Sequence, residues 1–140
     1  MGVNRPFRQS TDMAFRSDPC RVFLADDSAL IRSRVVSLLG QGAIVVGQGE
    51  TPEACIGGIL ATRPDVVVLD VQLLGGQGLE VLRTVHAVDP RIAFVVFSNN
   101  AGPAYRKRYL GAGAVDFLDK SAEFDQLAAA VVHASQRAVQ

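Results

Sequence analysis

The chain has 140 residues, 49% of them hydrophobic, which is enough for one domain with one buried core. Fourteen basic residues balance fourteen acidic ones, so the basic excess typical of nucleic-acid binding is missing and we expect no nucleic-acid partner. The two cysteines, Cys20 and Cys55, are too few and too far apart for a disulfide framework or a zinc knuckle. No apolar run reaches the roughly 20 residues that cross a bilayer, and no signal-peptide pattern opens the chain. We therefore expect a cytoplasmic protein without a membrane partner.

The first 19 residues are polar and lack a helical or strand period, which predicts a flexible tail. From Arg21 onward, short apolar runs alternate with amphipathic stretches, a pattern typical of a parallel sheet covered by helices. Five such units can be counted. The first is a strand over residues 22–25, followed by a helix that begins behind Ser28, a residue suited to the N-cap.

The second unit is a strand over residues 44–46 and a helix with a strong start. Thr51 suits its N-cap, and Pro52 suits its first turn. Gly57 and Gly58 lie inside this helix, and each costs about 1 kcal/mol relative to alanine. We therefore expect the second helix to be weak or irregular.

The third unit opens with a valine-rich run over residues 65–69, typical of a strand buried on both faces in the middle of a parallel sheet. The run ends at Asp70. The glycine-rich stretch 75–78 predicts a tight turn, and the apolar spacing that follows predicts a third helix.

The fourth and fifth units complete the pattern. A strand over residues 92–97 ends at Ser98, and a helix over residues 103–110 follows it. A last strand over residues 115–118 leads to a helix that we expect to begin behind Ser121. The five units together predict an α/β fold with a parallel sheet.

Polar side chains follow four of these strands: Asp26 and Asp27, Asp70, Ser98 and Lys120. The carboxyl ends of parallel strands meet at one edge of the sheet, so we expect these side chains to converge. Three close carboxylates need a compensating cation or a proton, and Mg²⁺, which prefers oxygen ligands of this kind, is the natural candidate. One aspartate can then act as a nucleophile toward a phosphoryl group, while the ammonium and the hydroxyl bind phosphoryl oxygens.

The same residue types, in the same order, make the chain resemble the receiver domain of two-component response regulators: Asp26-Asp27, Asp70, Ser98, Phe117 and Lys120. The resemblance covers roughly residues 20–137. It implies a flavodoxin-like (CheY-like) fold, with a five-stranded parallel sheet of strand order 2-1-3-4-5 and five helices on both faces.

This resemblance also implies a role for each acidic position. Asp70 would be the phosphoacceptor and a metal ligand, Asp27 a direct ligand of Mg²⁺, and Asp26 an outer-shell acid. The backbone carbonyl of Gln72 would be a further ligand. In the family, the side chain at the position of Gln72 influences how fast the acyl phosphate hydrolyses.

Ser98 and Lys120 would hold the phosphoryl group, and Phe117 would be the switch aromatic whose rotamer follows Ser98. Two positions depart from the common family pattern. Ser121 stands where many relatives have a proline after the lysine, and Leu74 stands where many have a proline in the loop after the acceptor. Neither change removes a reacting group.

The resemblance predicts a single-domain response regulator, with residues 20–140 as the receiver domain and no output domain. Its phosphoryl donor would be a sensor histidine kinase or a histidine phosphotransfer protein, and it would catalyse only its own phosphorylation and dephosphorylation. A downstream protein of unknown identity would dock on the fourth helix, the fifth strand and the fifth helix. Candidate contacts on the fourth helix are Tyr105, Arg106, Lys107, Arg108 and Tyr109.

Three other functions compete with this one. A phosphorylation-independent interaction protein would keep the fold without needing the complete acidic and lysine set. An aspartate-dependent phosphohydrolase would need a second aspartate as general acid, and the segment Asp70-Val71-Gln72 lacks it. A flavin-binding protein of similar fold would place its phosphate poorly against an acidic cluster.

Overall fold

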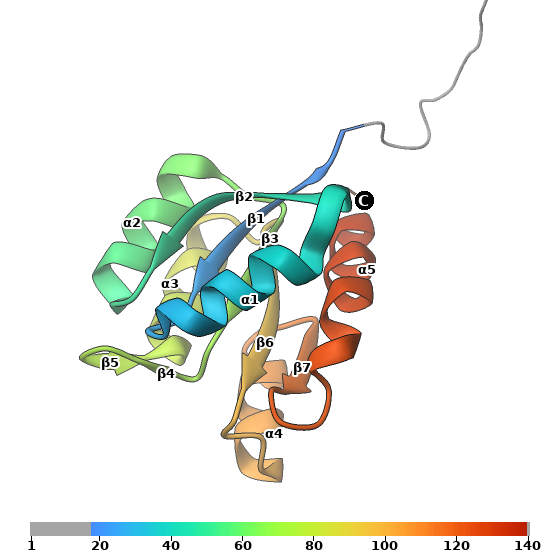
Figure 1. The fold of residues 1–140 in the computed structure, drawn as a ribbon. Coiled ribbons are helices and arrows are strands. Elements are labelled where there is room, and N and C mark those ends of the chain that lie inside the picture. The colour runs from blue at the N-terminus through green and yellow to red at the C-terminus, as the bar shows by residue number, and fades with distance from the viewer. Residues whose placement is uncertain (1–17, 140) are drawn as a thin grey trace, which may run out of the picture.

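The computed structural model describes residues 18–139, so the predicted tail lies almost entirely outside the described residues. Five parallel strands form one sheet: β1 (Cys20–Ala25), β2 (Ala43–Gly49), β3 (Val66–Leu69), β6 (Ala93–Ser98) and β7 (Asp116–Asp119). Their order is β2-β1-β3-β6-β7 (Figure 1). The predicted order of the five strands is confirmed.

Five α-helices cover this sheet: α1 (Ala29–Leu39), α2 (Pro52–Thr62), α3 (Gly78–Val88), α4 (Pro103–Gly111) and α5 (Leu127–Val139). Helices α1 and α5 pack on one face and lie toward the viewer in Figure 1, whereas α2, α3 and α4 pack on the other. Two single-turn 3₁₀ helices, η1 (Gly40–Gly42) and η2 (Phe124–Gln126), precede β2 and α5. None of the helices among residues 18–139 is long and apolar enough to cross a membrane.

Strand β3 is buried on both faces, as its valine run predicts. Val66 and Val68 belong to the core cluster under α1 and α5, while Val67 and Leu69 belong to the cluster under α2, α3 and α4. Burying one such side chain contributes about 1.5–3 kcal/mol to folding. The central strand therefore joins the two halves of the core, and it ends directly at Asp70.

Helix α2 is regular from Pro52 to Thr62, so the expectation of a weak or irregular helix was wrong. A Cβ on Gly58 would lie 2.7 Å from Cε2 of Phe23, and a Cβ on Gly47 in β2 would lie 2.8 Å from the same atom. The Phe23 ring therefore fills the space that these two glycines leave open. Close packing of α2 against the sheet offsets the helix propensity that glycine lacks.

The start of the last helix also differs from its prediction. Helix α5 begins at Leu127, after the turn η2, and Ser121 does not cap it. Instead, the Ser121 N–H and hydroxyl both donate to Oδ1 of Asp119, at 2.8 and 2.6 Å. The side chain of Ser121 is thus used to fold the loop behind β7, whereas Ser28 and Thr51 are confirmed as N-caps of α1 and α2.

The glycine-rich stretch after Asp70 forms more than a turn. Strands β4 (Gln72–Leu73) and β5 (Gly76–Gln77) make a short antiparallel ribbon whose tip contains Gly75, at a φ of 81°. Gly78 begins α3, where a Cβ would collide with the carbonyl oxygen of Asp70. Glycine at position 78 therefore allows α3 to start close behind the acidic residue.

Candidate functional site

Three carboxylates gather at the carboxyl ends of the central strands. Asp26 and Asp27 follow β1, and Asp70 follows β3. One oxygen from each of the three lies within 4.8 Å of the others. The structure therefore brings together the acidic residues that the sequence places at separate strand ends.

Lys120 links two of these carboxylates. Its Nζ lies 2.6 Å from Oδ2 of Asp26 and donates to Oδ2 of Asp70 at 2.9 Å. The side chains of Lys120, Asp26 and Asp70 are 6%, 9% and 10% exposed, so water screens these contacts little. Three carboxylates and one ammonium leave a formal charge of −2 at the site.

Burial and ion pairing have opposite effects on the pKa values of Asp26 and Lys120. Burial raises the pKa of Asp26, and the hydrogen bonds from Lys120 and the Ser28 N–H only partly oppose that rise. Burial also disfavours the Lys120 ammonium, but hydrogen bonds to Asp26 and Asp70 outweigh it, so the pKa of Lys120 is raised. Lys120 therefore stays charged at neutral pH.

Backbone hydrogen bonds fix the positions of the residues that carry these side chains. The Asp70 N–H donates to the Ala25 carbonyl at 2.9 Å, and the Asp26 N–H donates to the Gly49 carbonyl at 3.1 Å. The Lys120 N–H donates to the Ser98 carbonyl at 3.0 Å. Each bond continues the parallel ladder one step beyond a strand, which holds the neighbouring residues side by side.

The other two positions predicted for the metal site lie beside Asp26 and Asp70. Asp27 is exposed in the loop between β1 and α1, and Gln72 lies in β4 with its side chain in solvent. The Gln72 N–H points to Oδ1 of Asp70 at 3.4 Å, a long contact that leaves this oxygen weakly held. The roles of Asp27 and of the Gln72 carbonyl as ligands stay predictions.

Ser98 closes β6 and is almost completely buried. Its hydroxyl accepts a hydrogen bond from the Asn100 N–H at 3.0 Å, while its carbonyl receives the bond from Lys120. An accepting hydroxyl keeps its own hydrogen for another partner. Ser98 is therefore joined to Lys120 through the backbone and can still act as a donor.

Phe117 lies in β7 and is buried inside the protein. The Tyr109 ring packs edge-on against it, with centroids 6.1 Å apart. The Arg106 guanidinium lies 5.0 Å from the Phe117 centroid, and its Nη1 donates to the Phe117 carbonyl at 2.7 Å. Tyr109 is therefore a core residue, and its predicted place on the partner face was wrong.

Sequence reasoning missed a second basic residue that contacts Asp26, besides Lys120. Arg32 lies one helical turn after Ser28 and donates from Nη1 to the Asp26 carbonyl at 2.6 Å. A residue four positions after an N-cap has its side chain over the start of the helix. This spacing is the sequence signal that could have identified Arg32. Glu50, at the end of β2, pairs with this arginine.

The comparisons with known proteins decide the family. The family profile described as the response regulator receiver domain matches residues 22–132. The chain belongs to this family. Phosphorylation and Mg²⁺ binding are typical of these receiver domains.

Similarity to individual receivers extends over most of the described chain. The chain is 32% identical to response regulator GacA of Pseudomonas aeruginosa over 121 residues, which cover 84% of this chain and 56% of GacA. It is 34% identical to a protein-glutamate methylesterase/protein-glutamine glutaminase of Anaeromyxobacter dehalogenans, over 71% of this chain and 29% of that protein. The solved receiver domain of the putative response regulator NarL from Mycobacterium tuberculosis matches with a TM-score of 0.79 and 29% identity, over 85% of this chain and 98% of that one. The chain thus spans about half the length, or less, of these curated relatives.

Proposed function

We propose that this receiver domain accepts a phosphoryl group onto Asp70 and signals to another protein through a change of surface shape. The donor would be the phosphohistidine of a sensor histidine kinase or of a histidine phosphotransfer protein. The observation that carries the proposal is the buried contact of Lys120 with Asp26 and Asp70 inside a group of three carboxylates. The balanced charge of the chain favours a protein partner over nucleic acid.

The site fits Mg²⁺ because its possible ligand atoms are all oxygens and because its three carboxylates and one ammonium carry a formal charge of −2. Asp27, Asp70 and the Gln72 carbonyl would hold the ion, with Asp26 as an outer-shell acid. When bound, Mg²⁺ would neutralise charge on the phosphoryl oxygens. Cysteine or histidine, which zinc sites normally use, does not occur in this cluster.

The chemistry of transfer falls to Asp70. One of its carboxylate oxygens attacks phosphorus, the phosphorus–nitrogen bond of the donor breaks, and the imidazole nitrogen keeps the electron pair. Lys120 stays protonated and holds a phosphoryl oxygen, while the Ser98 hydroxyl donates to another. Attack of water on phosphorus later restores the free Asp70 carboxylate, so the domain acts only on itself.

The signal would leave the site through Ser98 and Phe117. A Ser98 hydroxyl that donates to a phosphoryl oxygen is drawn toward it, which strains its bond with the Asn100 N–H and alters the end of β6 next to the Phe117 strand. The surface of α4, β7 and α5 carries the exposed side chains of Tyr105 and Leu110. We propose this surface as the place where a downstream protein docks.

The deciding experiment is incorporation of phosphate from acetyl phosphate, read by intact mass. Wild type should gain one phosphoryl group in the presence of Mg²⁺ and none after chelation. Asp70→Asn should gain none under either condition, whereas an exposed control, Asp125→Asn, should behave like wild type. Folded wild type that takes up no phosphoryl group would contradict the proposal.

A phosphorylation-independent interaction module is the second candidate. It is favoured by the packing of Phe117, which Tyr109 and Arg106 hold in the interior and which gives the α4–β7 surface a fixed shape. Such a module would bind its partner equally well as wild type and as Asp70→Asn. The receiver mechanism instead predicts that acetyl phosphate changes the affinity of wild type alone.

A further inference from the structure

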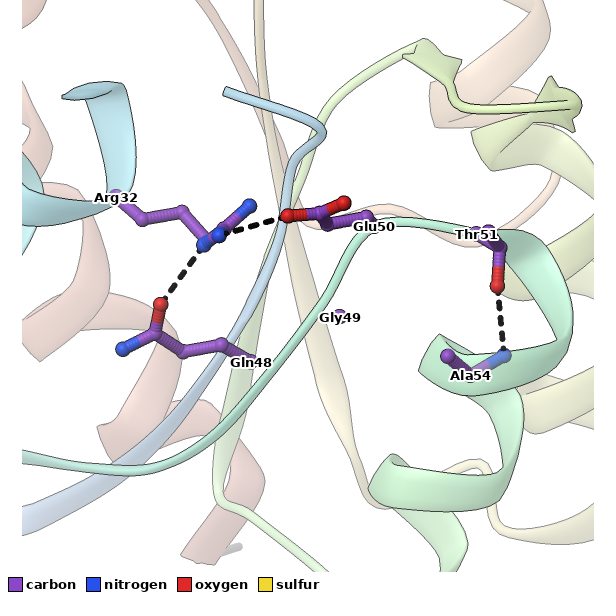
Figure 2. A pocket seen from close by; sticks show the side chains of 6 residues that line it. All are labelled: Arg32, Gln48, Gly49, Glu50, Thr51 and Ala54. Atoms are coloured by element: carbon purple, nitrogen blue, oxygen red, sulfur yellow. Dashed lines mark hydrogen bonds and ion pairs between the residues drawn. The ribbon is translucent and has the colours of Figure 1, made fainter. Parts of the chain in front are cut away.

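Arg32 spans the gap between α1 and the end of β2. Its Nε donates to Oε1 of Gln48 at 2.8 Å, and its Nη2 donates to Oε2 of Glu50 at 3.0 Å, as Figure 2 shows. Its Nη1 donates to the Asp26 carbonyl at 2.6 Å. The side chain is only 12% exposed. A guanidinium that uses all three nitrogens in fixed directions holds its partners in one geometry, which a lysine cannot do.

The carbonyl that Arg32 binds belongs to the peptide unit between Asp26 and Asp27. This unit is planar from one Cα to the next, so holding its oxygen restrains the positions of the Cα atoms of both residues that it joins. The Asp26 N–H is also held, by the Gly49 carbonyl at 3.1 Å. Arg32 and Gly49 thus hold the acidic pair from both sides, without contacting either carboxylate.

Glu50 extends this connection to the segment behind the phosphoacceptor. The Glu50 carboxylate pairs with Arg32, and the Glu50 carbonyl accepts a hydrogen bond from the Leu74 N–H at 2.8 Å. Leu74 lies at the tip of the ribbon formed by β4 and β5, and this ribbon begins two residues after Asp70. The loop after β2 therefore contacts both segments that carry the carboxylates.

We propose that Arg32 is a positioning residue for the divalent cation: it holds the peptide between Asp26 and Asp27 so that the two acids face Asp70. This inference rests on the proposed function, because it assumes that the acidic cluster binds Mg²⁺. The charge and the position of Arg32 act in opposite directions. A nearby positive charge by itself weakens binding of a cation, whereas an ordered acidic pair strengthens it.

The test is the Mg²⁺ dissociation constant of the full chain, measured by titration calorimetry without any phosphoryl donor. Arg32→Met should weaken binding about tenfold, in the range seen when groups that orient metal ligands are removed. Arg32→Lys keeps the charge that opposes the cation but loses the planar fork, and should weaken binding at least as much as Arg32→Met. Arg83→Met removes an exposed guanidinium from α3 and should leave the constant unchanged.

Equal or tighter binding by Arg32→Met would overturn the inference, and so would wild-type affinity in Arg32→Lys, which would show that the planar fork is not needed. If Arg32→Met does not fold, Glu50→Gln decides, compared with the nearby exposed Glu53→Gln, which makes the same change of charge. Glu50→Gln must weaken Mg²⁺ binding more than Glu53→Gln does. Wild type that binds no Mg²⁺ would refute the proposed function together with the inference, whereas Mg²⁺ binding that is insensitive to Arg32 refutes the inference only.

Discussion

Lys120 lies nearer to Asp26 than to Asp70, with Nζ 2.6 Å from the first carboxylate and 2.9 Å from the second. The ammonium of the proposed phosphoryl-binding lysine is therefore shared with an acid that is not the phosphoacceptor. Because Asp26 holds part of this charge, a phosphoryl group on Asp70 would compete with Asp26 for Lys120. The contact between Lys120 and Asp26 thus links the proposed metal-binding half of the site to the proposed phosphoryl-binding half.

Replacing Lys120 with methionine should make the folded protein depend on Mg²⁺. Without the ammonium, the buried Asp26 and Asp70 carboxylates repel each other, at a cost of about 3 kcal/mol. Mg²⁺ can relieve that repulsion, so it should raise the melting temperature of Lys120→Met more than that of wild type. Thermal unfolding with and without Mg²⁺ measures this difference, and an equal or smaller rise in the variant would contradict it.

Replacing Gln72 with alanine should change the lifetime of the acyl phosphate. The Gln72 side chain is exposed beside Asp70, where it can contact water that approaches the phosphoryl group. Its loss should alter the hydrolysis rate severalfold while leaving the free energy of unfolding within about 0.5 kcal/mol of wild type, as for most surface substitutions. The decay of phosphorylated protein by intact mass gives the rate, and equal lifetimes in the two proteins would refute the prediction.

Replacing Tyr109 with phenylalanine should stabilise the protein. Among the side chains that the structure describes, the Tyr109 hydroxyl is buried without a hydrogen-bond partner. Burial raises the pKa of this hydroxyl, and the nearby Leu79 backbone opposes that rise without reaching hydrogen-bond geometry. Removing an unsatisfied buried hydroxyl should gain about 1 kcal/mol in urea unfolding. A loss of stability would mean that the hydroxyl has a partner.

Asp89 should make stability depend on pH in the acid range. Hydrogen bonds from Arg91 and Arg63 outweigh the effect of burial and lower the pKa of Asp89 from 3.8 to about 2. Because the folded pKa is the lower one, this stabilisation is complete above pH 4 and is lost as the pH falls toward 2. Arg63 and Arg91 are 52% and 82% exposed, so screening reduces the contribution to about 1 kcal/mol.

The comparison is between wild type and Asp89→Asn in urea unfolding from pH 7 down to pH 2. The variant should be less stable at pH 7, and the two free energies of unfolding should converge below pH 4. The free energy of unfolding of the exposed control Asp125→Asn should change with pH in the same way as that of wild type. A difference between wild type and Asp89→Asn that does not depend on pH would contradict the assignment.

Much of the site could be predicted because its residues follow strands that are easy to recognise. A buried valine run ends at Asp70, and an apolar strand ends at Asp26, so topology alone brings them together. The helix-capping roles of Ser28 and Thr51 are local and were predicted for the same reason.

The features that sequence reasoning missed depend on contacts between distant segments. The regularity of α2 depends on the Phe23 ring, which is contributed by another element and fills the space beside Gly58. The turn at Ser121 depends on Asp119, a competing hydrogen-bond acceptor that periodicity does not reveal. Arg32 was missed because its partners belong to another segment of the chain: Gln48 lies in β2, and Glu50 follows it directly.

The backbone ladder that continues beyond the strands divides the site into two parts. One part joins Asp26 and Asp70 through β2, β1 and β3, and the other joins Ser98 and Lys120 through β6 and β7. Within each part the amides are protected, so the site should exchange hydrogen with solvent slowly despite its place at the edge of the sheet. Any movement during signalling would then involve side chains and the boundary between β3 and β6. The Lys120 side chain crosses this boundary to reach Asp70 and holds the two parts together.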